Sequence, residues 1–395
     1  MATKPIGSRA KRAAFAIMAV ATLATTAHAA PRSIDVVLPL TGATAFLGKA
    51  QQTALVNLEA AIAAGIIKAD PVHFVFHDDQ TSPQNAVQLA TGLIAGKPAV
   101  ILGSSQVAMC NAMAPLMKNG PVMFCLSPGI HPAANSFVFT SGVDTKDLAA
   151  AMIRYWRMKG VTRLGLITST DASGQDAERN IRSLVALPEN KDIAIVGDAR
   201  FNPGDVSVSA QIQRIKGNDP QALIAWATGG PIATVFKGIS EAGLDIPVAT
   251  TNGNMTYAQM DQYAAFLPKE LYIPSPAFMG TTLGDVSEPQ KVARKAFFDA
   301  YKTSGITPDS ASTLGWDPAM LVLSALSQLG PDATAEQLRA KLASTTGFIG
   351  VNGTYDFPAV PQRGVGEHEA VVTKWNPTAR TWQPVSLAGG VPPKP

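Results

Sequence analysis

The sequence contains few of the side chains that most often carry catalysis or bind metals. Its 395 residues include two cysteines and five histidines, and only 15% of the residues are charged. It has no Gly-x-Ser-x-Gly, His-Glu-x-x-His, Gly-x-x-x-x-Gly-Lys or Gly-x-Gly-x-x-Gly sequence, and each of these patterns marks a large class of enzymes. We therefore expect a protein that is not an enzyme and that needs no cofactor and no resident metal ion.

Long apolar runs and basic clusters are also missing. Beyond the N-terminal region no apolar run is long enough to cross a membrane. No basic patch alternates with aromatic side chains, so we expect no nucleic-acid partner.

The first 29 residues have the composition of a secretory signal peptide. Four basic residues precede an apolar run over residues 13–24, which ends in Ala27-His28-Ala29. No cysteine lies at the expected cleavage site after Ala29, so we expect no lipid anchor and a protein that is free in the periplasm. Removal of this leader leaves 28 Lys plus Arg against 29 Asp plus Glu, which changes the net charge from +3 to about −1.

The two cysteines, Cys110 and Cys125, allow two interpretations. A helix that runs back over its neighbouring strand would bring them level, and an oxidising compartment would then permit a disulfide. Both residues lie in apolar segments, however, where free cysteine behaves as a small hydrophobic side chain. We favour two free thiols and keep the disulfide as the alternative.

Short apolar segments alternate with segments of helical periodicity along most of the chain. Strands are predicted at residues 34–39, 72–77, 99–102, 121–126, 163–168, 193–196, 222–226 and 247–250. Helices are predicted at 49–64, 83–95, 148–158, 177–186 and 209–216, then at 289–303, 318–328 and 334–343, and a β-ribbon at 354–384. This alternation predicts an α/β fold with parallel sheets that helices cover on both faces. About 366 residues remain after the leader, enough for two lobes.

A polar turn within residues 99–131 is the first candidate site. Gly103 ends an apolar strand, Ser104, Ser105 and Gln106 open a helix, and the next strand ends at Ser127-Pro-Gly129. In open parallel sheets, ligands bind outside the carboxyl ends of the strands. The turn is therefore a candidate pocket for a small polar or anionic molecule, although serine is also a common helix cap.

His73 and His77 would lie on one face of their predicted strand. A metal site would need a further histidine or cysteine at a recognised spacing, and the sequence has none.

Several segments, taken in order, resemble the periplasmic leucine/branched-chain amino-acid-binding family. They are Pro39-Leu-Thr-Gly42, the Gly103 turn, Ser127-Pro128, Asp171-Ala-Ser-Gly-Gln, Gly204-Asp-Val-Ser-Val-Ser-Ala-Gln-Ile-Gln and Gly353-Thr-Tyr-Asp-Phe. The resemblance covers essentially the whole chain after the leader. It implies a type I periplasmic binding protein with two Rossmann-like lobes and three hinge crossings, which closes on its ligand by hinge motion.

The resemblance also implies domains and partners. The first lobe would comprise residues 30–142 and 275–345, and the second lobe residues 143–274 and 346–395. The protein would be a monomer that delivers one small molecule to an inner-membrane ABC permease and its ATPase. A ligand-sensing receptor subunit has the same fold and is the alternative; an α/β enzyme is a weaker one.

Matching the family position by position gives the expected ligand-binding residues. They are Phe46, Leu47, Ser104, Ser105, Gln106, Val107, Ala108, Gly129, Ile130, His131, Ser173, Thr228, Gly229, Asn252 and Trp316.

Much of the family's amino-acid clamp is missing at these positions. Its serine falls on Val107, the hydroxyls after Ser-Pro fall on Gly129 and His131, and its tyrosine falls on Ser173. The acid that pairs with the ligand ammonium is replaced by Asn252. Burial of an ammonium without a counter-charge costs several kcal/mol. The sequence therefore favours a small carboxylic acid, aromatic ones included, or an amide over an α-amino acid.

Two of these positions have an equally plain structural interpretation. Trp316 could fill the core near a hinge, and His131 could lie in an exposed loop.

Overall fold

The computed structural model of the protein describes residues 1–3, 31–278 and 286–394. The signal peptide expected at residues 1–29 falls almost entirely outside these ranges. Residues 31–395 form one compact unit. Among the described residues, no helix combines the length and the apolarity that a membrane span requires.

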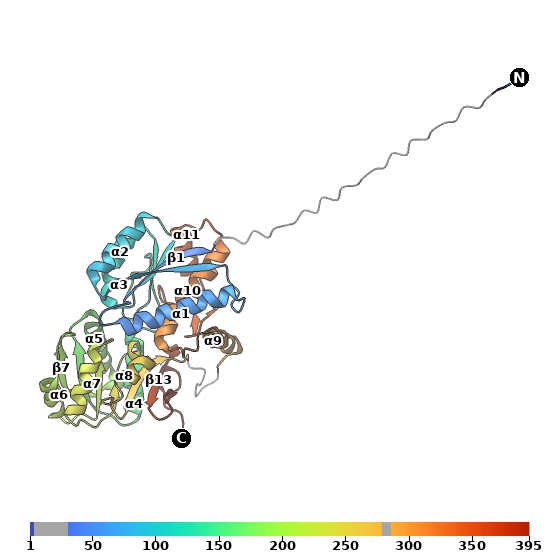
Figure 1. Cartoon of the computed structure of the whole chain (residues 1–395). Helices are drawn as coiled ribbons and strands as arrows, with labels where there is room; N and C mark the ends of the chain where they lie inside the picture. Colours follow the sequence, from blue (N-terminus) through green and yellow to red (C-terminus); the bar gives the residue numbers. More distant parts are fainter. Residues whose placement is uncertain (4–30, 279–285, 395) are drawn as a thin grey trace. The chain divides into compact units, whose positions relative to one another are not determined.

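A five-stranded parallel sheet forms the centre of the first lobe (Figure 1). Its order is β2-β1-β3-β4-β5, and the bounds are β1 Arg32–Leu38, β2 Val72–Asp78, β3 Val100–Gly103, β4 Val122–Cys125 and β5 Val138–Thr140. The helices that pack on it are α1 Ala45–Ala63, α2 Pro83–Ala95, α3 Val107–Met113, α10 Ser310–Leu329 and α11 Ala335–Ala343. A further helix, α9 Glu288–Tyr301, contacts α1.

Alternate strand residues supply the two faces of this sheet. Val36 and Leu102 join the apolar cluster that contains α1, α10 and α11. Val37 and Ile101 join the cluster that contains α2 and α3. Because side chains alternate along a strand, a central strand covered on both faces is apolar throughout, as the sequence indicates.

A seven-stranded mixed sheet forms the centre of the second lobe, in the order β14-β13-β10-β9-β8-β6-β7. Its strands are β6 Arg163–Ser169, β7 Ala194–Phe201, β8 Ala222–Trp226, β9 Val248–Ala249, β10 Leu271–Pro276, β13 Ala370–Asn376 and β14 Thr381–Pro384. The β10–β13 and β13–β14 pairs are antiparallel, and the other pairs of this sheet are parallel. The helices of this lobe are α4 Thr145–Met158, α5 Ala172–Val185, α6 Ser209–Lys216, α7 Pro231–Glu241 and α8 Tyr257–Gln262.

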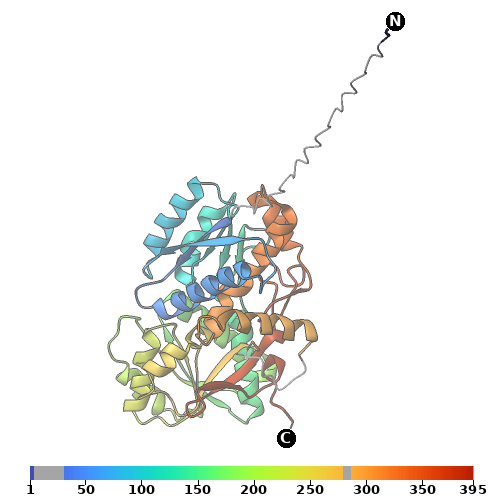
Figure 2. The ribbon, with the colours of Figure 1, turned by 45° about the vertical axis from the view of Figure 1, so that its right-hand side comes forward.

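The chain passes between the sheets three times, as the family resemblance implies. It leaves the first sheet after β5, leaves the second after β10, and returns to the second at β13. Orange α10 and α11 consequently lie with the blue N-terminal elements, and red β13 lies with the green and yellow ones (Figure 2). A separate two-stranded sheet, β11 Phe348–Ile349 with β12 Thr354–Tyr355, precedes the last passage.

The expected domain boundaries remain a prediction, but two contacts bear on them. Residue 275 lies inside β10, which pairs with β9 and β13. Gln362, in the segment expected to belong to the second lobe, donates through Nε2 to the carbonyl oxygens of Ser136 and Val138 beside the first sheet.

The start of α10 differs from the prediction, which placed it at Pro318. The helix begins at Ser310, where Asp309 and Ser312 form a capping box. Pro318 therefore lies inside the helix rather than at its start. The prediction followed the preference of proline for the first turn and missed the stronger polar cap upstream.

The cysteines form a disulfide, so the preference for free thiols was wrong. The Cys110–Cys125 bond joins α3 to β4, and the two Cα atoms are 6.0 Å apart. Both residues are fully buried. The apolar setting therefore does not exclude the bond, because α3 packs directly on the sheet and brings the two sulfurs together.

We predict that loss of this disulfide destabilises the first lobe. It closes a loop with a sequence separation of 15 residues, for which the chain-entropy model gives about 3 kcal/mol. Urea unfolding should show this loss for Cys110→Ser/Cys125→Ser. A reductant should destabilise the wild type and leave the double variant unchanged; equal stability of the two proteins in oxidising buffer would contradict the prediction.

Candidate functional site

A narrow cavity of about 20 Å³ lies where the carboxyl ends of strands from both sheets face one another. The first lobe contributes Leu47, Ser105, Gln106, Val107, Ser127, Pro128, Gly129 and Leu314; the second contributes Thr145, Ser173, Trp226, Thr228, Thr251, Asn252 and Gly253. Most of these residues end or follow β3, β4, β8 and β9 or begin α3, α4 and α5, whereas Leu47 lies in α1 and Leu314 in α10. The arrangement matches the position at which open α/β sheets bind ligands.

Gly103 allows the first turn to form. Its φ is +108°, and a Cβ atom there would lie 1.9 Å from the Val37 carbonyl oxygen. The two serines of this turn have different hydrogen-bond partners. The Ser104 hydroxyl points into the lobe and donates to buried Asp79 at 2.5 Å. The Ser105 hydroxyl donates to Gln51 Oε1 at 2.5 Å and lines the cavity.

The equivalent turns of the second lobe are held together by Asn254. Its Oδ1 accepts from the Gly229 N–H at 2.9 Å, and its Nδ2 donates to the Ala227 carbonyl at 2.7 Å and to Thr250 Oγ1 at 2.9 Å. These bonds join the turns after β8 and β9, so Asn252 and Thr228 are presented side by side. Sequence reasoning did not identify Asn254, because Asn-Gly-Asn is also an ordinary turn composition.

Two carboxamides at the cavity have no partner for their N–H₂ groups. Gln106 Nε2 and Asn252 Nδ2 are both buried without a hydrogen bond to any described residue. Gln106 is 7% exposed and Asn252 is 0% exposed. Buried polar groups in native proteins normally have a partner, so these two donors are the groups that a ligand would satisfy.

No charged side chain lines the cavity within the described part of the chain. Two acids just outside its wall, Asp144 and Asp176, are paired with cations. His131, from the loop after β4, contacts Asp176 of α5 through Nε2 at 2.9 Å and Asp144 through Nδ1 at 3.4 Å. Arg363 contacts the same Asp144 at 3.0 Å. Hydrogen bonds to Asp144 and Asp176 raise the pKa of His131 to about 9.

Eight of the fifteen expected residues line the cavity. They are Leu47, Ser105, Gln106, Val107, Gly129, Ser173, Thr228 and Asn252. The other seven do not: Phe46, Ser104, Ala108, Ile130, His131, Gly229 and Trp316.

Among these seven residues, the two aromatic side chains, Trp316 and Phe46, pack against other aromatic rings. The ring of Trp316 is buried and packs edge-on against Phe297, with centroids 5.0 Å apart. Phe46 of α1 meets Tyr263, which follows α8 in the other lobe, at 6.4 Å.

Seven residues outside the expected list also line the cavity, and two of them, Ser127 and Pro128, belong to the candidate pocket predicted within residues 99–131. The seven are Ser127, Pro128, Thr145, Trp226, Thr251, Gly253 and Leu314. Most adjoin a predicted strand end, and a wider window around each strand end would have included them. Leu314 has no local signal, because it lies on α10, far along the chain.

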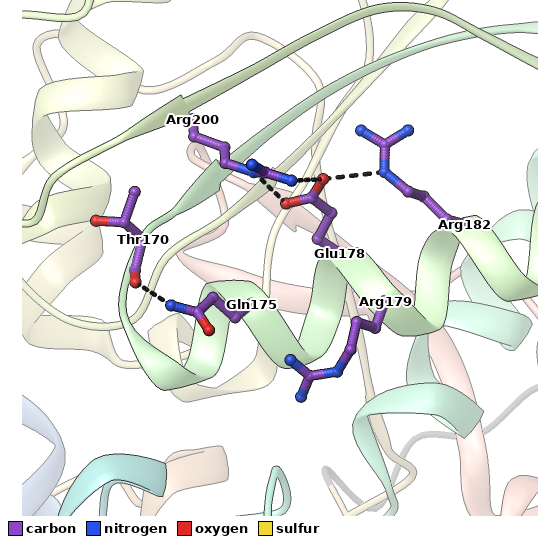
Figure 3. Close-up of a pocket in the computed structure, with 6 residues that line it drawn as sticks. All are labelled: Thr170, Gln175, Glu178, Arg179, Arg182 and Arg200. Atoms are coloured by element: carbon purple, nitrogen blue, oxygen red, sulfur yellow. Dashed lines mark hydrogen bonds and ion pairs between the residues drawn. The ribbon is translucent and has the colours of Figure 1, made fainter.

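A second hollow lies on the outer side of α5 in the second lobe, and Figure 3 shows its six residues. Glu178 accepts hydrogen bonds from Arg200 and Arg182, and the Arg200 bonds contribute most to lowering the pKa of Glu178 to about 2. Arg179 contacts Asp176 at 3.3 Å. Each guanidinium already has a carboxylate partner, so this hollow is an ion-pair network with no free charge for a ligand.

Comparisons with known proteins agree with this geometry. A family model described as "periplasmic binding protein" matches residues 33–380. An extracellular ligand-binding receptor from Rhodopseudomonas palustris HaA2 has a similar structure, with 19% identity, a TM-score of 0.78, and coverage of 90% of this chain and 99% of that one. No curated protein matches the sequence.

Two similar structures contain a small molecule that their titles name. One is a branched-chain amino acid transporter substrate binding protein from Streptococcus pneumoniae in complex with isoleucine, with 20% identity, a TM-score of 0.74, and coverage of 90% and 99%. The other is a solute binding protein of an ABC transporter from R. palustris in complex with benzoate, with 19% identity, a TM-score of 0.73, and coverage of 92% and 97%. At these identities the likeness shows the fold.

We predict that the His131 ion pairs stabilise the protein in a pH-dependent way. A pKa raised from 6.5 to about 9 gives a contribution that is complete below about pH 6.5 and is lost as the pH rises through about 9. His131→Gln should therefore lower the free energy of unfolding at pH 6.5 and match the wild type near pH 10. Denaturant unfolding across this range is the measurement. His73→Gln, at an exposed ion pair of the first lobe, is the control, and a pH-independent effect of His131→Gln would contradict the prediction.

Proposed function

Because the chain belongs to the periplasmic binding protein family, we propose that it is the solute-binding component of a branched-chain-amino-acid-type ABC importer. It closes by hinge motion on one small ligand and delivers it to an inner-membrane permease with its ATPase. In this proposal residues 1–29 are a cleaved signal peptide, and the protein is a monomer free in the periplasm.

The cavity between the strand ends carries this proposal. Side chains from both lobes line it, and the chain crosses between the lobes three times. A ligand held there would contact both lobes at once, so it would stabilise the arrangement in which they face each other.

The ligand proposed is a small carboxylic acid, aromatic ones included, or an amide. An α-amino acid would bring an ammonium group, and the cavity lining contains no acid to pair with it. Gln106 and Asn252 instead present free N–H donors, which suit a carbonyl or carboxylate oxygen. Isoleucine and benzoate are the molecules named for two similar proteins, and the second is an acid without an ammonium.

We predict that deaminated acids or amides stabilise the protein more than branched-chain amino acids do. A ligand at 100 times its dissociation constant adds about 2.7 kcal/mol of stability, which a thermal-shift screen detects. The largest shift with leucine, isoleucine or valine would refute the ligand class. X-ray scattering with and without the best ligand should show compaction, and an unchanged radius of gyration would refute hinge closure.

We further predict that Asn252→Asp reverses the charge preference of the cavity. The substitution keeps the shape of the side chain and places a negative charge where the side chain is 0% exposed. It should weaken binding of the best acid by at least about 1.4 kcal/mol, or tenfold. Calorimetric titration is the measurement, and Asn135→Asp, at an exposed turn, is the matched control. Equal affinities of wild type and Asn252→Asp would make Asn252 only a turn residue.

A further inference from the structure

The two unpartnered carboxamides at the cavity come from opposite lobes. Gln106 precedes α3 of the first lobe, and Asn252 follows β9 of the second. We infer that the ligand is a monocarboxylate with an apolar body, and that the N–H₂ groups of Gln106 and Asn252 hold its carboxylate from the two sides. This inference rests on the proposed function and narrows it to one charge type and two specificity-determining residues.

Among the described residues that line the cavity, Gln106 and Asn252 are the ones with a buried side-chain donor that has no partner. The Ser105 proton is donated to Gln51. The Ser173 and Thr228 hydroxyls share one hydrogen bond at 3.2 Å, which uses the proton of one of them. The Thr251 hydroxyl donates to Asn252 Oδ1 at 3.4 Å, so this oxygen faces Thr251 and Nδ2 is left free.

Free donors match a carboxylate rather than an ammonium. A carboxylate only accepts hydrogen bonds, and an ammonium only donates them. Hydrogen bonds to a charged acceptor are about twice as strong as those between neutral groups. The same two amides would therefore hold an acid more firmly than its neutral amide, provided that no nearby negative charge opposes it.

Two acids near the cavity, Asp144 and Asp176, would repel a bound carboxylate, but they are paired with cations around His131. Asp176 Oδ2 lies only 3.7 Å from the position that a Cβ on Gly129 would take, so this acid stands directly behind the cavity wall. His131 and Arg179 both contact Asp176, and Arg363 contacts Asp144. Asp144 and Asp176 are thereby paired with cations before a ligand arrives.

The rest of the cavity is suited to an apolar body. Leu47, Val107 and Leu314 line it from the first lobe, and Trp226 lines it from the second. None of these side chains is charged, so a second charged group on the ligand would have no partner among them. A branched or aromatic monocarboxylate satisfies both parts of the site, whereas a dicarboxylate or an amino acid leaves one charge buried and unpaired.

Three matched sets of probes test the charge type. Benzoate, benzamide and benzylamine form the aromatic set; isovalerate, isovaleramide and isopentylamine form the branched set; leucine and phenylalanine complete the panel. Isothermal titration should give tighter binding for the acid than for its amide and amine in at least one set. Tighter binding of an amide, amine or amino acid, or no binding of either acid, overturns the inference.

Variants at the two amides test the shared grip with the tighter-binding acid. Gln106→Met and Asn252→Leu remove the donors while roughly keeping size, and each should weaken binding at least about tenfold. The double variant should lose less than the product of the two single losses, because one carboxylate bridges both groups. Gln106→Glu should weaken binding more than Gln106→Met does. Gln213→Glu, an exposed residue of α6, makes the same charge change and should leave affinity unchanged.

The outcomes separate this inference from the proposed function. Compaction with a ligand that is not a carboxylate would leave the carrier function standing and refute the inference. Losses below threefold in both single variants, with unchanged unfolding curves, would show that the amides do not hold the carboxylate. Failure of every ligand in the wider screen to compact the protein would instead count against the proposed function.

Discussion

The ends of the parallel strands are buried against one another, and this burial constrains everything else at the cleft. Turns at strand ends carry unpaired backbone groups and polar side chains, which normally require water or a partner. Asp79, Gln51 and Asn254 supply these partners from inside each lobe. Among the described lining residues, the N–H₂ groups of Gln106 and Asn252 are the buried side-chain donors that remain without a partner. The hydrogen bonds made within each lobe therefore determine which polar groups at the cavity remain available to a ligand.

The acids near the cleft are likewise paired with partners from within the protein. Acids occur near the cleft because aspartate caps helices that begin there, as Asp144 and Asp171 do for α4 and α5. A charge-free cavity therefore needs cations placed behind it. His131 and Arg363 meet this need from segments far apart in the sequence, and they also connect the loop after β4 with the second lobe. These cations contact acids and do not line the cavity.

The architecture could be predicted from the sequence because apolar period and turn composition are local signals. Strand ends after β3, β8 and β9 were placed correctly, and Ser105, Thr228 and Asn252 line one cavity for that reason. Tertiary details were less accessible. Leu314 and Trp316 lie two residues apart on α10, yet the first lines the cavity and the second packs into the core. Which of the two residues faces the cavity depends on where α10 starts and on how it is rotated against α1. The prediction that this helix starts at Pro318 left both residues outside it.

The disulfide has a consequence for when the cleft is complete. Cys110 lies four residues after Gln106, and Cys125 two residues before Ser127, so the bond clamps together the two first-lobe segments that border the cavity. Its formation requires an oxidising environment. A freshly synthesised chain under reducing conditions has every residue of the recognition surface but lacks the covalent frame beneath it. Completion of this cleft therefore requires oxidation as well as folding, and preparations that differ in oxidation history differ in the covalent link between two segments that border the cavity.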